Sequence, residues 1–75
     1  MVFPVTLTTR DQVTKLNTVA GEQDFDIFIH CGNIMVNAKS LLGLLNLVGK
    51  QGYIVAPDHA KPENFVQALK KMGYT

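Results

Sequence analysis

Tryptophan is absent from this sequence of 75 residues, and cysteine and charged residues are scarce. The single cysteine, Cys31, excludes an internal disulfide and fits a reducing compartment, so we expect a cytoplasmic protein. A net charge of +1 gives no electrostatic reason to expect nucleic acid or an acidic membrane surface as a partner. No apolar run approaches the roughly 20 residues of a membrane span. The first residues also lack the basic start and apolar core of a signal peptide.

Apolar residues make up 47% of the sequence, which is enough for a hydrophobic core. The length predicts one domain over residues 1–75. A chain of this size buries only about 60% of the surface that it exposes when unfolded, so we expect modest stability.

The hydrophobic pattern predicts the order strand, helix, strand, strand, helix, strand, helix. We expect strands at 2–7, 25–31, 34–37 and 53–56, and helices from Thr9 to 21, from Ser40 to 48 and from Pro62 to 73. Thr9 and Gln12 fit a capping box, and Gly32-Asn33 fits a two-residue hairpin turn with glycine first. The hairpin implies antiparallel pairing, with the helices packed on one face of the sheet. The residues expected to be buried are Ile27, Ile29, Val36, Leu44, Leu47, Phe65 and Leu69.

The stretch from Val36 to Gly52 contains more aliphatic side chains than one helix face needs. Ser40 stands where a helix N-cap is expected, and six aliphatic residues occupy the eight positions after it. Leu41, Leu44, Leu45 and Val48 share one helical face, whereas Leu42 lies off this stripe. Either this helix is almost fully buried, or part of it is an exposed apolar patch.

The same stretch resembles the HPr family, the histidine phosphocarriers of the bacterial sugar phosphotransferase system. The resemblance is carried by Asn37-x-Lys39-Ser40, two aliphatics, glycine, two aliphatics and the Gln51-Gly52 exit. It is ungapped over 36–52 and weaker back to 24 and forward to the C-terminus. It implies an α/β (α+β) open-faced sandwich of order β-α-β-β-α-β-α, in which three helices cover one face of a four-stranded antiparallel sheet. This is also the order that the pattern predicts.

The first third of the chain departs from the family. In the family, the phosphoryl group is carried by a histidine at the start of the first helix, beside an arginine. Counting back from Ser40 places Thr9 at the histidine position and Asp11 at the arginine position, and no histidine precedes His30. A threonine hydroxyl titrates far above pH 7, whereas imidazole titrates near it at about 6.5. Asp11 would repel a phosphate, so we interpret the carrier activity as lost and expect no enzymatic activity.

The two histidines predict no metal site, and we expect no cofactor. His30 and Cys31 are adjacent on an expected strand and should point to opposite faces, so they are poorly placed to share an ion. His59 follows Asp58 in a loop without further ligands and should be solvated.

Ser40 and the leucines after it are the remaining candidates. The resemblance matches Ser40 to a serine that a kinase phosphorylates in HPr proteins of many Gram-positive bacteria, although an N-cap role alone would explain it. It matches Leu41, Leu42 and Leu45 to positions through which HPr-like proteins bind partners. The alternative is that these three leucines belong to the core. Because Leu44, Leu47 and Val48 can supply the core, we expect partial exposure.

The leading hypothesis is a regulatory or protein-binding module, monomeric or weakly dimeric, that binds a protein partner through the Ser40 helix. One alternative is a functional phosphocarrier of the phosphotransferase system. The other is a structural subunit that associates with a second copy through its leucines.

Overall fold

The structure is a computed structural model that describes residues 2–57 and 63–71. Four strands and three helices lie within these residues, in the order that the sequence predicts. They are β1 (Val2–Leu7), α1 (Arg10–Gly21), β2 (Phe28–Cys31), β3 (Ile34–Asn37), α2 (Leu41–Leu45), β4 (Lys50–Val55) and α3 (Glu63–Lys71).

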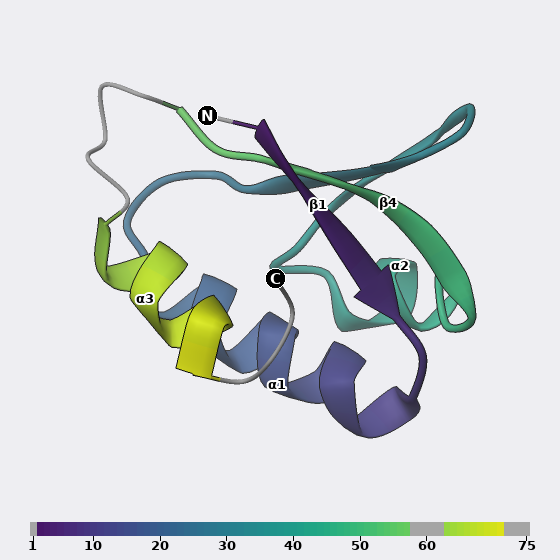
Figure 1. Cartoon of the computed structure of the whole chain (residues 1–75), viewed down its shortest axis with the longest axis horizontal. Coiled ribbons are helices and arrows are strands. Elements are labelled where there is room, and N and C mark those ends of the chain that lie inside the picture. Colours follow the sequence, from purple (N-terminus) through teal and green to yellow (C-terminus); the bar gives the residue numbers. More distant parts are fainter. Residues whose placement is uncertain (1, 58–62, 72–75) are drawn as a thin grey trace.

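The strands form one antiparallel sheet in the order β1-β4-β2-β3 (Figure 1). β4 lies between β1 and β2, whereas β1 and β3 are the edges. Pro4 therefore lies on an edge strand, where a residue without an amide N–H is tolerated. The helices lie on one side of the sheet, and the other side is not covered by any described element. The predicted open-faced α+β sandwich is thus confirmed.

The core lies between the sheet and the helices. Of the seven residues expected to be buried, six are fully buried: Ile27, Ile29, Leu44, Leu47, Phe65 and Leu69. The prediction was wrong for Val36, which is only half-buried. It lies on the edge strand β3, so no further strand covers its outer side.

Three predicted boundaries were wrong by three residues each, for reasons that lie outside the element itself. β2 begins at Phe28 rather than Phe25, because Phe28 pairs with Val55, the last residue of β4. β4 begins at Lys50 rather than Tyr53, because β1 supplies a pairing partner for each of its six residues. α2 ends at Leu45, three residues before Val48, because the chain must turn back to enter β4.

The turn after α2 shows how this reversal is made. Leu47 N donates to Leu44 O at 2.9 Å, a bond over three residues that tightens the end of the helix. Gly49 has a φ of 86°, a backbone conformation that favours glycine, and its N–H donates to Leu7 O. Gly32 has a φ of 61°, in agreement with the predicted hairpin turn with glycine first.

Some expectations fall outside the described residues. They are the loop around Asp58 and His59, the helix start at Pro62 and the helix end at Gly73. Among the described helices, none has both the length and the apolar character needed to cross a membrane.

Candidate functional site

The start of α1 is held by a hydrogen-bonded capping box, as the sequence predicts. Thr9 is the N-cap, and its Oγ1 accepts from Gln12 N at 3.2 Å. In return, Gln12 Oε1 accepts from Thr9 N at 3.3 Å, from Thr8 N at 2.8 Å and from Thr8 Oγ1 at 2.6 Å. The Gln12 side chain therefore folds back over the helix start and occupies donors that an anion would otherwise use.

Asp11 places a carboxylate in the first turn of the same helix. It forms an ion pair with Lys15 across 3.1 Å, one helical turn on, and both side chains are exposed. An exposed pair of this kind contributes only about 0.3–0.5 kcal/mol. Asp11 nevertheless places a negative charge in the first turn of α1, and this charge opposes an anion at the helix start.

The second helix begins at Ser40, whose side chain makes the expected cap. Ser40 Oγ accepts from Gly43 N at 3.3 Å, and the Ser40 side chain is exposed. Gly43 lies against β3: a Cβ added there would approach Val36 Cβ to 3.3 Å. α2 therefore packs close to the edge strand β3, and this packing sets the direction in which the leucines of α2 point.

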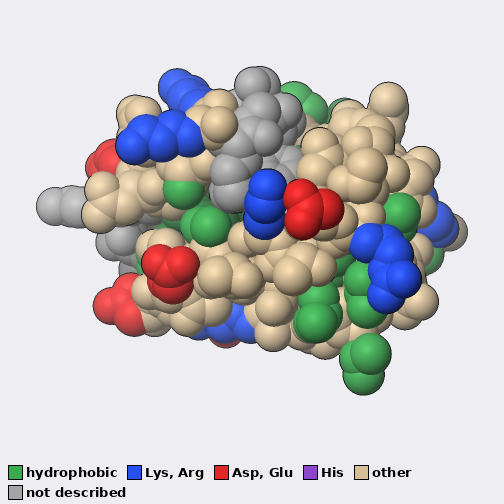
Figure 2. Space-filling model, turned by 90° about the horizontal axis from the view of Figure 1, so that it is seen from below, with side chains coloured by type: hydrophobic (Ala, Val, Ile, Leu, Met, Phe, Trp, Pro, Cys, Tyr) green, Lys and Arg blue, Asp and Glu red, His purple; other side chains and the backbone are tan. Residues whose placement is uncertain are grey.

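The leucines of α2 divide between the core and the surface. Leu44 is fully buried, whereas Leu42 is 79% exposed, Leu41 is 39% exposed and Leu45 is half-buried. We call Leu41, Leu42 and Leu45 the α2 patch. Figure 2 views the helix side and shows hydrophobic side chains gathered toward the right, where Figure 1 places α2. The expected partial exposure of these leucines is confirmed, and their role in binding stays a prediction.

His30 and Cys31 point to opposite faces of the sheet. Cys31 is buried in the core, where desolvation raises the pKa of its thiol and nearby Lys50 partly counteracts the rise. A buried thiol of raised pKa is a poor nucleophile at neutral pH. His30 is half-buried and pairs with Met35 and Tyr53 on the neighbouring strands. Within residues 2–57 and 63–71, no three His, Cys, Asp or Glu side chains are grouped as a metal site requires.

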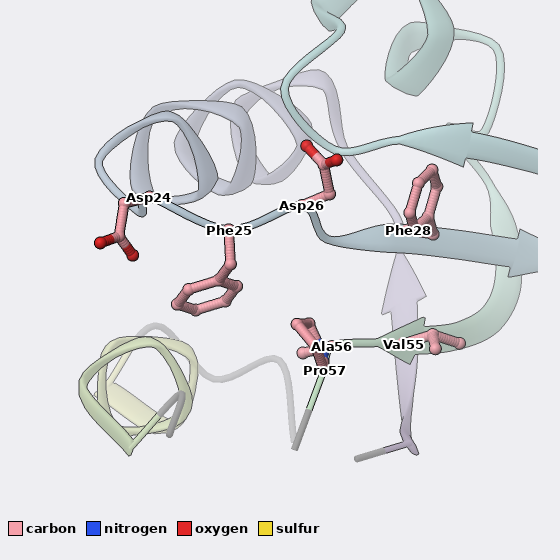
Figure 3. A pocket seen from close by; sticks show the side chains of 7 residues that line it. All are labelled: Asp24, Phe25, Asp26, Phe28, Val55, Ala56 and Pro57. Atoms are coloured by element: carbon pink, nitrogen blue, oxygen red, sulfur yellow. The ribbon is translucent and has the colours of Figure 1, made fainter. Parts of the chain in front are cut away.

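A pocket of about 560 Å³, which our sequence reasoning did not identify, lies where the chain enters β2 (Figure 3). Asp24, Phe25, Asp26 and Phe28 line one side, and the end of β4 lines the other. The alternation of acidic and aromatic residues in this segment was a usable signal. The period-two pattern from Phe25 onward predicts only a strand.

The sequence matches no protein-family model and no curated protein. The structure is similar to solved structures. A phosphocarrier protein HPr from Bacillus anthracis (strain Ames) superposes with a TM-score of 0.64 and 21% identity, covering 84% of this chain and 89% of that one. HPr-C-His from Thermoanaerobacter tengcongensis gives a TM-score of 0.67 and 20% identity, covering 96% and 86%. At these identities the likeness shows the fold: this chain has the fold of the HPr proteins.

Proposed function

We propose that this chain is an HPr-like domain that carries no phosphoryl group and acts as a small regulatory or protein-binding module. The α2 patch is its proposed contact surface. The observation that carries the proposal is the exposure of Leu42, at 79%, two residues before Leu44, which fills the core. A leucine so exposed contributes little to folding, whereas its burial against a partner would contribute roughly 1.5–3 kcal/mol.

The start of α1 supports the proposal that this chain carries no phosphoryl group. A phosphocarrier needs a side chain that accepts and releases a phosphoryl group near neutral pH, and imidazole suits this requirement. Thr9, at the matching position, uses its hydroxyl as a helix cap, and the Gln12 side chain covers the donors beside it. Asp11 adds a negative charge in the same turn. These features favour a closed helix start over a site for a phosphoryl group.

Incubation with enzyme I and phosphoenolpyruvate should produce no acid-labile phosphohistidine on this chain. The reason is that the helix-start position holds Thr9, which cannot form one. Intact-mass measurement before and after mild acid treatment checks the result. An HPr protein that carries the histidine serves as the positive control in the same mixture. A label on His30 or His59 would contradict the proposal and favour the alternative of a functional phosphocarrier.

Ser40 is the candidate for regulation by phosphorylation, because it is exposed and borders the α2 patch. Ser40→Asp, which imitates the added charge, should leave the fold intact: a carboxylate at a helix start stabilises it by about 0.3–1 kcal/mol. The same charge beside the leucines should weaken the binding of an apolar partner. Thermal melts and capture of partners on the immobilised chain measure the two effects.

Ser40→Ala is the matched control, because it removes the cap without adding charge. It should lower the stability by about 0.5–2 kcal/mol and leave binding at temperatures below the melt unchanged. If Ser40→Asp captures partners as well as the wild type does, Ser40 does not control the α2 patch.

A further inference from the structure

The side of the sheet that the helices leave open is lined by uncharged side chains (Figure 1). Along each strand every second side chain points to this side, and those on the other side, such as Ile29 and Ile54, are buried in the core. We call the outward set the open face. It consists of Val2, Pro4, Thr6, Phe28, His30, Met35, Asn37, Gln51, Tyr53 and Val55. None of them is an aspartate, glutamate, lysine or arginine, although the outer face of an antiparallel sheet is normally polar.

The open face has an apolar centre and a polar margin. Its apolar members and His30 lie in two neighbouring rows of register partners, Pro4-Tyr53-His30-Met35 and Val2-Val55-Phe28. Val2, Met35 and Tyr53 are 63%, 57% and 55% exposed, and they are three of the six exposed large hydrophobic residues in the described part of the chain. The polar members at the margin are Thr6, Gln51 and Asn37. Protein interfaces share this arrangement of an apolar centre within a polar rim.

A hollow of about 310 Å³ lies between β1 and β4 on the same face. It is lined by Pro4, Thr6, Gln51 and Tyr53, together with Val5 and Gly52. Met35 stands in the same row as Pro4 and Tyr53, but on the opposite edge strand, β3. The open face therefore has a hollow near one edge and an exposed, flexible methionine at the other.

We propose that a second copy of this chain packs on the open face, sheet against sheet, as a weak two-fold dimer. When the two-fold axis runs between the sheets along the strands, β1 of one copy lies over β3 of the other. Met35 of each copy then meets the hollow beside Tyr53 of the other copy. The two sheets would pack about 10 Å apart, as in β-sandwiches.

Charge decides in favour of a second copy as the occupant. A face that carries charges of one sign repels its own copy, and the open face carries none on its strands. Asp26 lies beside the margin, where its Oδ1 accepts from Asn37 Nδ2 at 3.4 Å. The net charge of +1 adds little repulsion between two copies. A nucleic acid or an acidic surface would find no lysine or arginine on this face.

The size of the open face predicts weak association. Four strands about 4.8 Å apart, with four to six residues of about 3.3 Å each, span roughly 250–400 Å² per copy. A standard stable interface takes about 800 Å² per partner, so we expect a dimer with a Kd of about 0.1–1 mM. This inference does not rest on the proposed function, because the α2 patch belongs to the helix side of the sheet.

A dilution series of the ¹⁵N-labelled full chain tests the proposal. Between about 0.05 and 2 mM, we expect the amides of Phe28, His30, Met35 and Tyr53 to shift along one dimerisation curve, and the rotational correlation time to rise. The amides of the α2 patch should stay in place. No change up to about 2 mM, or changes confined to the α2 patch, would overturn the proposal.

Variants show which face is buried. Met35→Lys and Tyr53→Lys each place two like charges in the dimer and should weaken dimerisation at least tenfold. Thr18→Lys adds the same charge on an exposed position of α1 and should leave the Kd unchanged. Each amide spectrum shows whether the variant is folded, and Met35→Lys, on an edge strand, decides alone if Tyr53→Lys unfolds. A dimer that persists in Met35→Lys but is lost in Leu42→Glu would overturn the proposal and leave the proposed function standing.

Contacts between copies test the two-fold arrangement. In an equal mixture of ¹³C-labelled and unlabelled chains at about 2 mM, isotope filtering removes the signals that arise within one copy. We expect a nuclear Overhauser effect between the Met35 methyl group of one copy and the Tyr53 ring of the other. A dimer without this contact would contradict the arrangement in which Met35 enters the hollow.

Discussion

Replacing Gly52 by alanine should remove a large part of the stability of this protein. Gly52 lies in β4, which pairs with β1 on one side and with β2 on the other. A Cβ at this position would overlap the His30 carbonyl oxygen and the Cys31 Sγ. Overlap with backbone cannot be relieved by a side-chain rotation, and a strand paired on both sides cannot move aside. We expect a loss of about 3 kcal/mol or more, out of about 4–11 kcal/mol that is typical of this length.

Urea denaturation followed by circular dichroism measures this loss. Gly21→Ala is the matched control: Gly21 is the last residue of α1, and an added Cβ there meets no atom within 4 Å. This control should be neutral or stabilising by up to about 1 kcal/mol. If Gly52→Ala shifted the urea midpoint no more than Gly21→Ala does, the close approach of β4 to β2 at Gly52 would be wrong.

Glutamate at Leu44 should unfold the domain, whereas glutamate at Leu42 should leave it folded. Leu44 is fully buried, so the substitution would bury an unpaired charge, and a small domain cannot offset that penalty. Leu42 is 79% exposed, so its replacement should change the stability by less than about 0.5 kcal/mol. Binding through the α2 patch should nevertheless weaken markedly. Thermal melts of both variants and the wild type measure the first effect.

The thermal melt of Leu42→Glu also decides whether Leu42 belongs to the core or to a contact surface. A large loss of melting temperature in Leu42→Glu would mean that this leucine is core, and the binding proposal would fail. The alternative of self-association through the leucines is tested by sedimentation over a range of concentrations. A dimer of the wild type that Leu42→Glu abolishes would identify a second copy of the chain as the partner.

The candidate sites could be predicted from sequence to different degrees. The cap at Ser40 and the exposure of Leu42 followed from the spacing of residues within one helix, where each position is set by neighbours a few residues away. The pocket did not follow, because the local pattern predicts a strand from Phe25 to Cys31. Its lining includes the end of β4, about thirty residues further along the chain, which no local pattern connects to it.

The sequence by itself determined the order of the elements, the capping box at Thr9 and the hairpin turn at Gly32. These depend on hydrogen bonds and backbone preferences within a few residues, so a local pattern is sufficient to predict them. Only the tertiary structure decided where the strands and the second helix stop. Phe28 starts β2 because Val55 ends β4, Lys50 starts β4 because Leu7 is there to pair with it, and α2 ends early because the chain must turn back to make that pairing. A strand extends only as far as its partner does, and the partner is distant in sequence.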